Sequence, residues 1–558
     1  MSQLEGGELI VKVLKEEGVK YIFTLCGGSI IPIYDACLDY GIKVIGVRNE
    51  QTASYMADAW GRLTRQPGVC AVTSGPGHTN ALTGLATAYL AHSPMILISG
   101  HCYLEDIEKD AFQEIDQVGM AAPVTKWSKL VTDVKRIPDY MATAFRQATS
   151  GKPGPVHLSI PRDIMEGKVE ESEVTFMPPA KYRSQARIRG DSELIKAAVQ
   201  LLTQAEKPAV IVGGGVHWSD ANAELKEFIE LTQVPLFTKE DEMGCVAENF
   251  PFYFGLASRR NNDVAFKLEE ADVVLVLGLR LDSRSLYGQP PFFGEKMKLI
   301  RVDLTPEELG KNREHEIGIV GDMKSVLVDM IEEARKINSW GRTAWLAELR
   351  TARENFFKAR EKIRHSDAQP VHPLRLCHEI EKFLGTQNTL VTDGGDIGQW
   401  AKVAFYSRHP NHWLTVGAIG GVGCGIPFAL AAQLARPQHR TILLSGDGSF
   451  GFGAMEFDIA IKNNIPIVAV LSNDEYWGII RHPQIARYGE ERAIGTELGF
   501  TRYDKIVEAL GGYGEFVENP NEIGPALERA LDSGVPACVN VMTEFANPMY
   551  SAAAPSSR

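Results

Sequence analysis

The sequence predicts an α/β protein of three domains, each a doubly wound parallel β-sheet with helices on both faces. Short, continuous apolar runs recur along the 558 residues and alternate with segments of helical length. Strands that are covered on both faces are apolar without alternation, and parallel strands need crossover segments between them. The clearest of these runs are VCAVTSG (69–75), MILISG (95–100), AVIVGGG (209–215), VVLVLG (273–278), LVTDGG (390–395), TILLSG (441–446) and IVAVLSN (467–473).

Two polar stretches predict the domain boundaries. The segment PPAKYRSQARIRGD (178–191) is rich in Pro and Arg, and residues 339–372 contain a charged, helix-like run that ends in SDAQPVHP. They predict domains at residues 1–182, 190–340 and 365–545, each of ordinary domain size, followed by a tail at 546–558. The outer two domains also share a faint repeat, because a glycine turn and a helix precede both MILISG and TILLSG. This repeat is consistent with two related domains that flank a third.

Composition excludes several classes of protein. Apolar residues make up 44% and charged residues 23% of the chain, which is typical of a globular protein and not of a disordered or fibrous one. The 58 Lys and Arg against 71 Asp and Glu give a charge of −13, which disfavours non-specific nucleic-acid binding. The eight cysteines form no CxxC pair, and the N-terminus has no signal-peptide pattern. We expect a cytoplasmic protein without a nucleic-acid partner.

One segment imitates a membrane span. Residues 413–435 contain no charged side chain and are long enough to cross a bilayer. Glycines crowd the first half of this segment, however, and Pro427 follows them. We therefore expect a buried glycine loop that leads into a helix, and no association with a membrane.

The strongest chemical signal lies in the last third of the chain. Gly446-Asp447-Gly448-Ser449 follows one predicted strand, and Asn473 ends the next, 26 residues after Asp447. A carboxylate, an amide oxygen and main-chain carbonyls form an oxygen-rich site for a hard ion such as Mg²⁺, which leaves places for two phosphate oxygens.

With this interval the two motifs form the thiamin-diphosphate signature, and the chain resembles the thiamin-diphosphate-dependent enzymes of the acetolactate synthase-like superfamily. Further pieces follow in the family's order over nearly the whole chain: RNEQTASYMADAWGRLT, SGPGHTNALTGLATAY, AFQEIDQ, VDLTPEELGKN and GGVGCGIP. The resemblance implies a pyrimidine-binding domain, a central nucleotide-binding-like domain and a diphosphate-binding domain.

The resemblance also implies roles for single residues. Glu50 would share a proton with the pyrimidine ring of the cofactor, and Asp447, Asn473 and the main-chain carbonyl of Glu475 would bind Mg²⁺. Because the family's glutamate acts on a cofactor held mainly by another chain, a homodimer at least is implied, and a dimer of dimers, a homotetramer, is expected. The remaining cofactor-binding residues implied in this way are Gly420, Val422, Gly446, Gly448 and Ser449.

The central domain poses a separate question. The family uses this domain to bind FAD, to bind ADP, or only as structure. Gly214, Arg280 and Asp303 are the candidate nucleotide contacts, and the sequence leaves the choice among these three uses open.

The stretch after the metal ligands separates members of the superfamily. Acetolactate synthases that prefer larger keto acids typically have a tryptophan at the position that Pro483 occupies here. Its absence weakens the synthase interpretation. The segment DAFQEIDQV and the tail NPMYSAAAPSSR look closer to the 2-hydroxyacyl-CoA lyases and oxalyl-CoA decarboxylase. In those enzymes the tail folds over the CoA thioester, so the resemblance implies an active-site lid at 546–558. The implied substrate residues are Phe112, Gln113, Ile480 and Tyr550.

The favoured interpretation is a carbon–carbon lyase that cleaves 2-hydroxyacyl-CoA to formyl-CoA and an aldehyde or ketone, reversibly by acyloin condensation. Gln113 is included among the catalytic residues, and candidate bases for the substrate hydroxyl are His78 and a glutamate of YGEERAIGTELG, with Glu497 preferred. Two alternatives remain: an acetolactate synthase-like transferase acting on pyruvate, and a flavin-dependent oxidoreductase like pyruvate oxidase. The chain length of the substrate stays undetermined.

Overall fold

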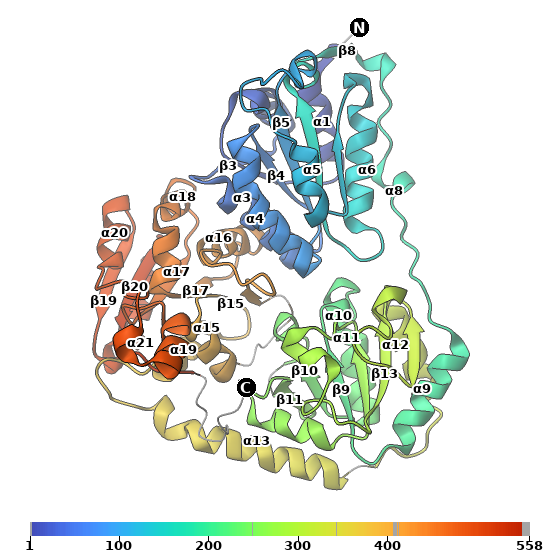
Figure 1. Ribbon diagram of the computed structural model, residues 1–558, viewed down its shortest axis with the longest axis vertical. Helices are drawn as coiled ribbons and strands as arrows, with labels where there is room; N and C mark the ends of the chain where they lie inside the picture. Colours follow the sequence, from blue (N-terminus) through green and yellow to red (C-terminus); the bar gives the residue numbers. More distant parts are fainter. Residues whose placement is uncertain (1–2, 248, 342, 406–409, 411, 549–558) are drawn as a thin grey trace.

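The computed structural model describes residues 3–247, 249–341, 343–405, 410 and 412–548. In this part of the chain, three six-stranded parallel sheets form three domains, accompanied by a small antiparallel ribbon of β1 (Gln3–Glu5) and β8 (Lys168–Glu170). The prediction of three doubly wound α/β domains is confirmed. Figure 1 shows the three domains grouped around a common centre.

The N-terminal sheet has the strand order β3-β2-β4-β5-β7-β6. Alternate side chains of its strands enter two separate apolar clusters, one packed by α1, α2 and α6 and the other by α3 and α4. Both faces are therefore buried, which explains the continuous apolar runs. The strands are β2 (Tyr21–Thr24), β3 (Lys43–Gly46), β4 (Gly68–Val72), β5 (Met95–His101), β6 (Trp127–Leu130) and β7 (Pro155–Pro161). The main helices are α1 (Gly6–Glu16), α2 (Ile31–Tyr40), α3 (Glu50–Thr64), α4 (Pro76–Ala91), α5 (Gln117–Ala121) and α6 (Ile137–Thr149).

The C-terminal sheet, β16-β15-β17-β18-β20-β19, repeats the N-terminal order, since in both domains the strands in chain order lie as 2-1-3-4-6-5. The faint repeat in the sequence thus has a counterpart in topology. The strands are β15 (Thr389–Asp393), β16 (Trp413–Thr415), β17 (Thr441–Gly446), β18 (Val468–Asn473), β19 (Tyr513–Val517) and β20 (Ala537–Met542). The main helices are α14 (Pro373–Leu384), α15 (Asp396–Ala404), α16 (Gly425–Ala435), α17 (Asp447–Phe452), α18 (Phe457–Lys462), α19 (Gly478–Tyr488), α20 (Tyr503–Leu510) and α21 (Ile523–Asp532).

The middle sheet differs from the other two. Its order β11-β10-β9-β12-β13-β14 corresponds to 3-2-1-4-5-6, and such an order creates a crevice at the carboxyl ends of the two strands where it reverses. The strands are β9 (Pro208–Val212), β10 (Leu236–Thr238), β11 (Tyr253–Leu256), β12 (Val273–Leu277), β13 (Lys298–Asp303) and β14 (Ile317–Val320). The main helices are α9 (Ser192–Gln204), α10 (Gly215–Trp218), α11 (Asn222–Thr232) and α12 (Met323–Ala334).

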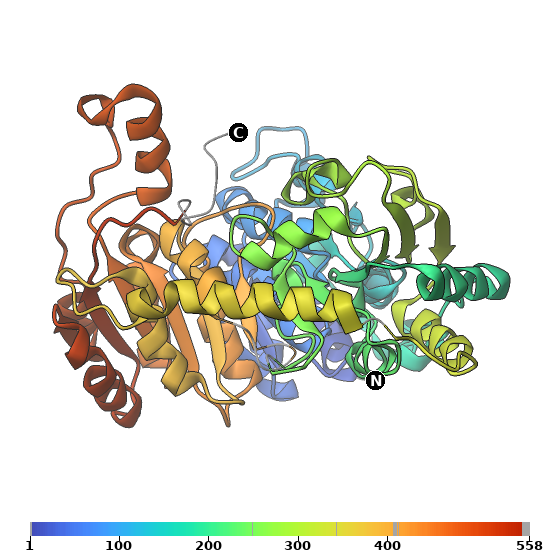
Figure 2. The same cartoon turned by 90° about the horizontal axis from the view of Figure 1, so that it is seen from below.

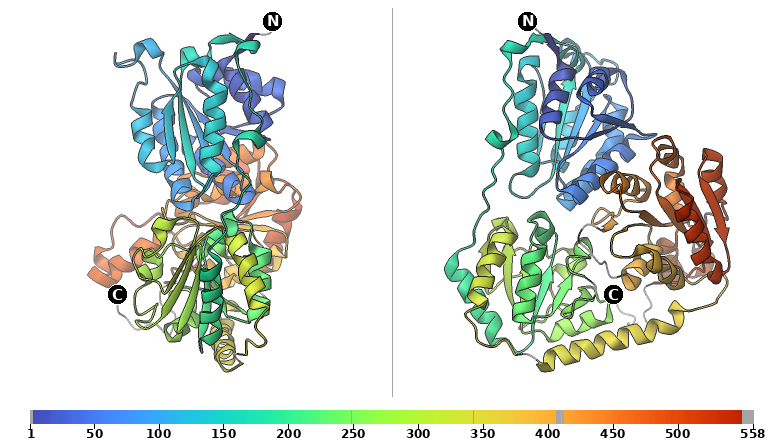
Figure 3. Two further views of the ribbon diagram at one scale, coloured as in Figure 1. Left: turned by 90° about the vertical axis from the view of Figure 1, so that its right-hand side faces the viewer. Right: turned by 180° about the vertical axis from the view of Figure 1, so that it is seen from behind.

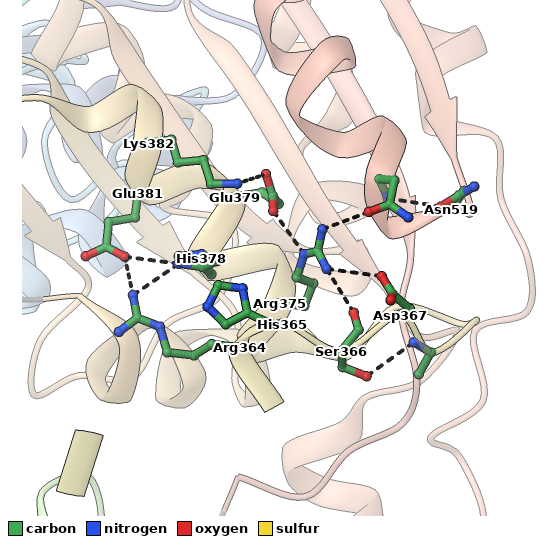
Figure 4. Close-up of polar contacts among 12 residues, drawn as sticks. Arg364, His365, Ser366, Asp367, Arg375, His378, Glu379, Glu381, Lys382 and Asn519 are labelled. Atoms are coloured by element: carbon green, nitrogen blue, oxygen red, sulfur yellow. Dashed lines mark hydrogen bonds and ion pairs between the residues drawn. The ribbon is translucent and has the colours of Figure 1, made fainter. Parts of the chain in front are cut away.

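Two connections join the domains. Beyond the short helix α8 (Pro179–Tyr182), the chain runs extended along the outside of the molecule to α9 (Figure 3). The long helix α13 (Thr343–Arg364) crosses from the middle to the C-terminal domain, as Figure 2 shows. Its end is fixed to α14 by the ion pair of Arg364 with Glu381, beside the pair of Arg375 with Glu379 (Figure 4).

Residues 413–435, the run that imitates a membrane span, divide into the short strand β16, a loop and the helix α16. The loop and helix are as predicted, but residues 418–420 of the loop are exposed in the single chain and not buried. No helix among the described residues combines the length and the apolar character needed to cross a bilayer.

Helix α16 ties the N- and C-terminal domains together. One apolar cluster contains side chains from the first sheet, α3, α4, α16 and the third sheet. The ring of Tyr55 meets Phe428 edge-on at 5.9 Å, and Arg62 donates to the carbonyl of Thr415 while it pairs with Asp58. The start of α3 therefore has a fixed position relative to the glycine loop that precedes α16.

We predict that Gly84→Ala loosens this packing. A Cβ on Gly84 of α4 would lie 2.1 Å from Oγ and 2.9 Å from the main-chain carbon of Ser54 on α3, so the two helices would have to separate. We expect a loss of about 1–3 kcal/mol, visible as a lower thermal unfolding midpoint. The matched control is Gly398→Ala in α15, where a Cβ meets nothing within 4 Å. An equal loss in both variants would contradict the packing argument.

Candidate active site

Neighbouring strands of the third sheet bring the predicted metal ligands together. Gly446 of β17 pairs with Ser472 of β18, so Asp447 and Asn473 follow side by side at the carboxyl edge of the sheet. Both side chains are buried. The sequence interval of 26 residues is thus the length of one strand–helix–strand crossover.

The two ligand atoms fit a cation. Asp447 Oδ2 and Asn473 Oδ1 are buried oxygens that find no hydrogen-bond partner within the described part of the chain. Burial raises the pKa of Asp447 to about 7, and burial together with the charge of Asp447 raises that of Asp474 to about 8. Unpaired buried acceptors and adjacent buried carboxylates are unfavourable without a positive charge between them, so this donor set suits Mg²⁺. The described residues contain no group of three or more His, Cys, Asp or Glu arranged around a metal, so main-chain and phosphate oxygens would have to complete the shell.

Glu475, the third predicted ligand, has an unusual backbone. Its φ of 68° turns the chain directly after the strand, and its amide donates to the Asp447 carboxylate. Its carbonyl accepts the amide of Leu498 at 2.8 Å. A carbonyl oxygen has two lone pairs, so one remains for a metal ion.

The motif Gly446–Ser449 contacts the carboxylate of Asp393, which the sequence analysis did not single out. A Cβ on Gly448 would lie 2.8 Å from the ring of Trp477, so a larger residue here would require the indole to shift. Asp393, at the end of β15, accepts the amide of Gly425 at 2.7 Å and the hydroxyl of Ser449. Burial raises the pKa of Asp393 to about 6. It joins the loop before α16 to the Gly446–Ser449 motif.

Glu50 is the first residue of α3, at the carboxyl edge of the N-terminal sheet. Asn49 caps the helix by accepting the amide of Gln51, and the Glu50 side chain turns toward α4. There Asn80 donates to Glu50 Oε2 at 2.9 Å, and a Cβ on Gly77 would lie 3.3 Å from Oε1. The carboxylate is 5% exposed and has one side-chain donor, which leaves acceptor capacity for a ligand.

The loop before α16 presents backbone to solvent in the single chain. Gly420 is exposed, with a φ of 68°, and Val422 is half-buried. Ile419 beside them is 38% exposed. This loop is thus available to contact a cofactor or a second chain.

Comparison with known proteins identifies the family. Residues 4–120, 195–330 and 393–541 match the N-terminal TPP binding domain, the central domain and the C-terminal TPP binding domain of thiamine pyrophosphate enzymes. The chain belongs to the thiamine pyrophosphate enzyme family. Thiamine pyrophosphate, or thiamin diphosphate, is accordingly its cofactor.

Relatives of two kinds match the chain over nearly its full length. The acetolactate synthase large subunit IlvG of Mycobacterium tuberculosis is 34% identical over 97% of this chain and 96% of that protein. The 2-hydroxyacyl-CoA lyase of Arabidopsis thaliana is 32% identical over 97% and 96%. The acetolactate synthase isozyme 2 large subunit of Escherichia coli is 31% identical over 96% and 95%. The chain is thus a thiamine pyrophosphate enzyme of the acetolactate synthase-like superfamily.

The substrate residues predicted for this thiamine pyrophosphate enzyme lie on exposed segments. Phe112 is 88% exposed, and Gln113, with a φ of 61°, accepts the hydroxyl of Ser74 at 2.9 Å. Ile480 on α19 is 55% exposed. Tyr550 lies outside the described residues.

The two candidate bases are placed less favourably. His78 is completely buried, and its Nδ1 lies 2.9 Å from Ser99 Oγ, which also contacts His157. Burial lowers the pKa of His78 to about 4. Glu497 has a side chain 69% exposed and pairs with Arg481. His78 is therefore a core histidine of the N-terminal domain, which does not support its predicted contact with substrate, and Glu497 lies in a surface loop.

A histidine–aspartate pair that sequence reasoning missed lies at the edge of the third sheet. His482 Nε2 of α19 lies 3.0 Å from Asp396 Oδ2 at the start of α15, and both side chains are 9% exposed. The imidazole stacks on Phe545 with ring centres 3.9 Å apart. These contacts fix α19 beside the metal ligands and anchor the chain just before the tail.

The three candidate nucleotide residues line one cavity of about 780 Å³. Gly214 follows β9, Arg280 follows β12 and Asp303 ends β13, so all three lie at the carboxyl edge of the middle sheet. His92 and Trp413 bring the outer domains to the cavity wall. Burial raises the pKa of Asp303. Structure thus brings these residues together where the strand order reverses.

We predict that His78 makes stability depend on pH. The unfolded chain binds a proton on this histidine near pH 6.5 and the folded chain only near pH 4, so between these values the unfolded state binds more protons. Stability therefore falls as pH drops from 6.5 to 4, by at most about 1.4 kcal/mol per pH unit for this group. In His78→Asn the fall of the thermal unfolding midpoint with acid should be shallower. His365→Asn, which removes an exposed imidazole, is the control, and identical slopes in wild type and His78→Asn would refute the assignment.

Proposed function

We propose that this thiamine pyrophosphate enzyme is a Mg²⁺-dependent carbon–carbon lyase. Its substrate would be a 2-hydroxyacyl-CoA, cleaved to formyl-CoA and an aldehyde or ketone, and the reaction would also run as an acyloin condensation. Membership of the family supports thiamin-diphosphate chemistry. Two relatives, from a plant and an animal, are named as 2-hydroxyacyl-CoA lyases, and these names support the proposed substrate class.

One observation carries the choice of subclass. Pro483 lies inside α19, five residues after the start of the helix at Gly478 and near the metal ligands. A proline has no amide hydrogen, so the carbonyl of Ile479 receives no helical hydrogen bond from that position. In acetolactate synthases with a preference for larger keto acids, an indole would occupy position 483. A site without that indole supports an acyl-CoA substrate over a second keto acid.

Acetolactate synthase activity is the second candidate. It is favoured by the 34% identity to the IlvG protein, against 32% to the plant lyase, although this difference is small. In that case pyruvate would be both donor and acceptor.

The chain's own residues support the common first steps of either reaction. When bound, thiamin diphosphate would supply carbanion chemistry at the substrate carbonyl. Glu50 would hold a proton at the pyrimidine ring, and Asn80 orients the Glu50 carboxylate through the 2.9 Å hydrogen bond. Asp447 and Asn473 would hold Mg²⁺ and, through it, the diphosphate. Gln113 accepts the hydroxyl of Ser74 with its amide oxygen, so its amide nitrogen would be available to a substrate.

The cavity of the middle domain suits an adenine nucleotide, ADP or FAD. Asp303 at the end of β13 is placed to accept from ribose hydroxyls, and glycines after β9 allow backbone to approach a diphosphate. A yellow purified protein would identify FAD, and release of ADP on denaturation would identify ADP.

A homodimer at least, arranged as a dimer of dimers, is part of the proposal. Large apolar side chains are exposed next to the site in the single chain: Phe112 by 88%, Phe452 by 59% and Met455 by 58%. Exposed apolar groups of this size beside a functional site are typical of a protein interface. A second chain would cover them and bring its own Glu50 to the Asp447 of the first.

We predict formyl-CoA and the matching aldehyde or ketone when the enzyme receives thiamin diphosphate, Mg²⁺, pyruvate and a panel of 2-hydroxyacyl-CoA thioesters. Mass spectrometry of the mixture detects both products and ranks the thioesters. Glu50→Gln is the control and should bind the cofactor while turnover falls by about 10²–10⁴-fold, because the proton at the pyrimidine ring is lost. Acetolactate with intact thioesters would instead establish the synthase.

We predict that two inactive variants restore each other when they share a dimer. Glu50→Gln and Asp447→Ala, co-expressed with different affinity tags and purified over both, would form one site with both residues intact and one with both altered. The mixed dimer should show about half the wild-type turnover. Turnover no higher than that of either parent variant would mean that Glu50 and Asp447 act within one chain.

A further inference from the structure

We infer that Asn540 is a positioning residue for the metal site, because it acts with the main-chain carbonyl of Thr501 to hold the nitrogen end of Asn473 away from the metal and the oxygen end toward it. This inference rests on the proposed Mg²⁺ site at Asp447 and Asn473. Asn540 lies on β20, the strand next to β18, and is completely buried, as is Asn473.

The contacts of Asn473 leave its amide one orientation. Its Nδ2 donates to Asn540 Oδ1 at 3.2 Å and to the carbonyl of Thr501 at 3.2 Å. Its Oδ1 is buried and has no hydrogen-bond partner among the residues that the structure describes. The nitrogen end is thus held toward β20, and the oxygen end is left for the metal.

This orientation matters because the two ends of a side-chain amide are chemically opposite. The oxygen accepts, and it is a ligand for Mg²⁺, whereas the nitrogen carries two hydrogens and repels a cation. A rotation by 180° about the last bond would exchange them at almost no cost in shape. Only the hydrogen-bond partners distinguish the two orientations.

Asn540 is itself oriented by groups that can only accept. Its Nδ2 donates to Thr501 O at 3.1 Å and to Asp504 Oδ1 at 3.2 Å. Burial of Asp504 opposes its charge, but hydrogen bonds from Arg502 and Asn540 outweigh this effect and lower its pKa. Arg502 Nη2 lies 2.6 Å from Asp504 Oδ2. Asp504 therefore remains an acceptor, and Asn540 must turn its oxygen to Asn473.

The result is a chain of hydrogen bonds with a fixed direction, defined here as the amide relay of Asp504, Asn540 and Asn473. The carboxylate of Asp504 accepts from the nitrogen of Asn540, so Asn540 turns its oxygen to the nitrogen of Asn473. The oxygen of Asn473 then faces the proposed metal. Removal of a residue that hydrogen-bonds to a metal ligand typically lowers the affinity of the protein for the metal by about 10–100-fold.

The test measures Mg²⁺ binding without turnover. Wild type and Asn540→Leu, stripped of metal, are titrated with Mg²⁺ at saturating thiamin diphosphate while tryptophan fluorescence is recorded. Trp477 lies against Gly448 and should report the occupied site. In Asn540→Leu the Mg²⁺ midpoint should rise about 10–100-fold, and the full fluorescence change should return at high Mg²⁺.

Two further variants separate positioning from general destabilisation. Asn262→Leu is the matched control, because Asn262 is also buried and its Nδ2 donates to Phe254 O at 2.7 Å and Leu256 O at 2.8 Å, but in the middle domain. It should keep the wild-type Mg²⁺ midpoint even with a lower thermal unfolding midpoint. Asp504→Asn replaces a pure acceptor by a group that also donates, and should raise the midpoint several-fold even if Asn540→Leu fails to fold.

The outcomes are distinct. An unchanged Mg²⁺ midpoint in Asn540→Leu, or an equal rise in Asn262→Leu, would overturn the role of Asn540. An unchanged midpoint in Asp504→Asn would overturn the relay from Asp504. Cofactor binding by the wild type that is independent of Mg²⁺ would overturn the proposed metal site itself.

Discussion

The concentration of carboxylates at one buried edge of the third sheet is the constraint on which the site depends. Parallel strands end at the same edge, so Asp393, Asp447 and Asp474 arrive together with Asn473. Burial raises the pKa of each of the three acids, which means that their shared ionisation is unfavourable in the protein alone. The divalent cation proposed for this edge would offset the cost of these buried charges. The surrounding glycines and the buried amides follow from the same need, since they let a diphosphate approach and keep oxygens directed at the cation.

Much of the fold could be predicted because its signals are local. The seven quoted apolar runs all contain strands, and each is continuous because helices cover both faces of its sheet. The strand order could not be predicted in this way. Orders 2-1-3-4-6-5 and 3-2-1-4-5-6 use similar strands and helices, and they differ only in which strands pair. The packing of α16 on α3 depends on the complementary shapes of Tyr55 and Phe428, which are far apart in the chain.

In the site, too, features with local sequence signals could be predicted, and features that depend on distant parts of the chain could not. Asp447 and Asn473 were predictable, because one crossover fixes their spacing and the register of β17 and β18 places them side by side. The position of His78 after the turn that follows β4 suggested a base for the substrate hydroxyl. Its side chain instead lies in the core, within hydrogen-bond distance of Ser99. Exposure of a single side chain depends on the rotation of its helix against the sheet. Asp393 and Asn540 gave no local signal, since each matters only through residues from other strands.

The amide relay shows how such remote residues acquire a function. Hydrogen bonding among side-chain amides is ambiguous, because a rotation by 180° exchanges the accepting oxygen and the donating nitrogen of an asparagine at almost no cost in shape. A chain of them has a defined direction only if one end is a group that cannot change its role. Asp504 is such a group, and Arg502, at the surface, keeps it ionised. The atom that Asn473 would present to the proposed metal is therefore influenced from outside the site, by the buried carboxylate of Asp504 and its exposed partner Arg502, in addition to the carbonyl of Thr501.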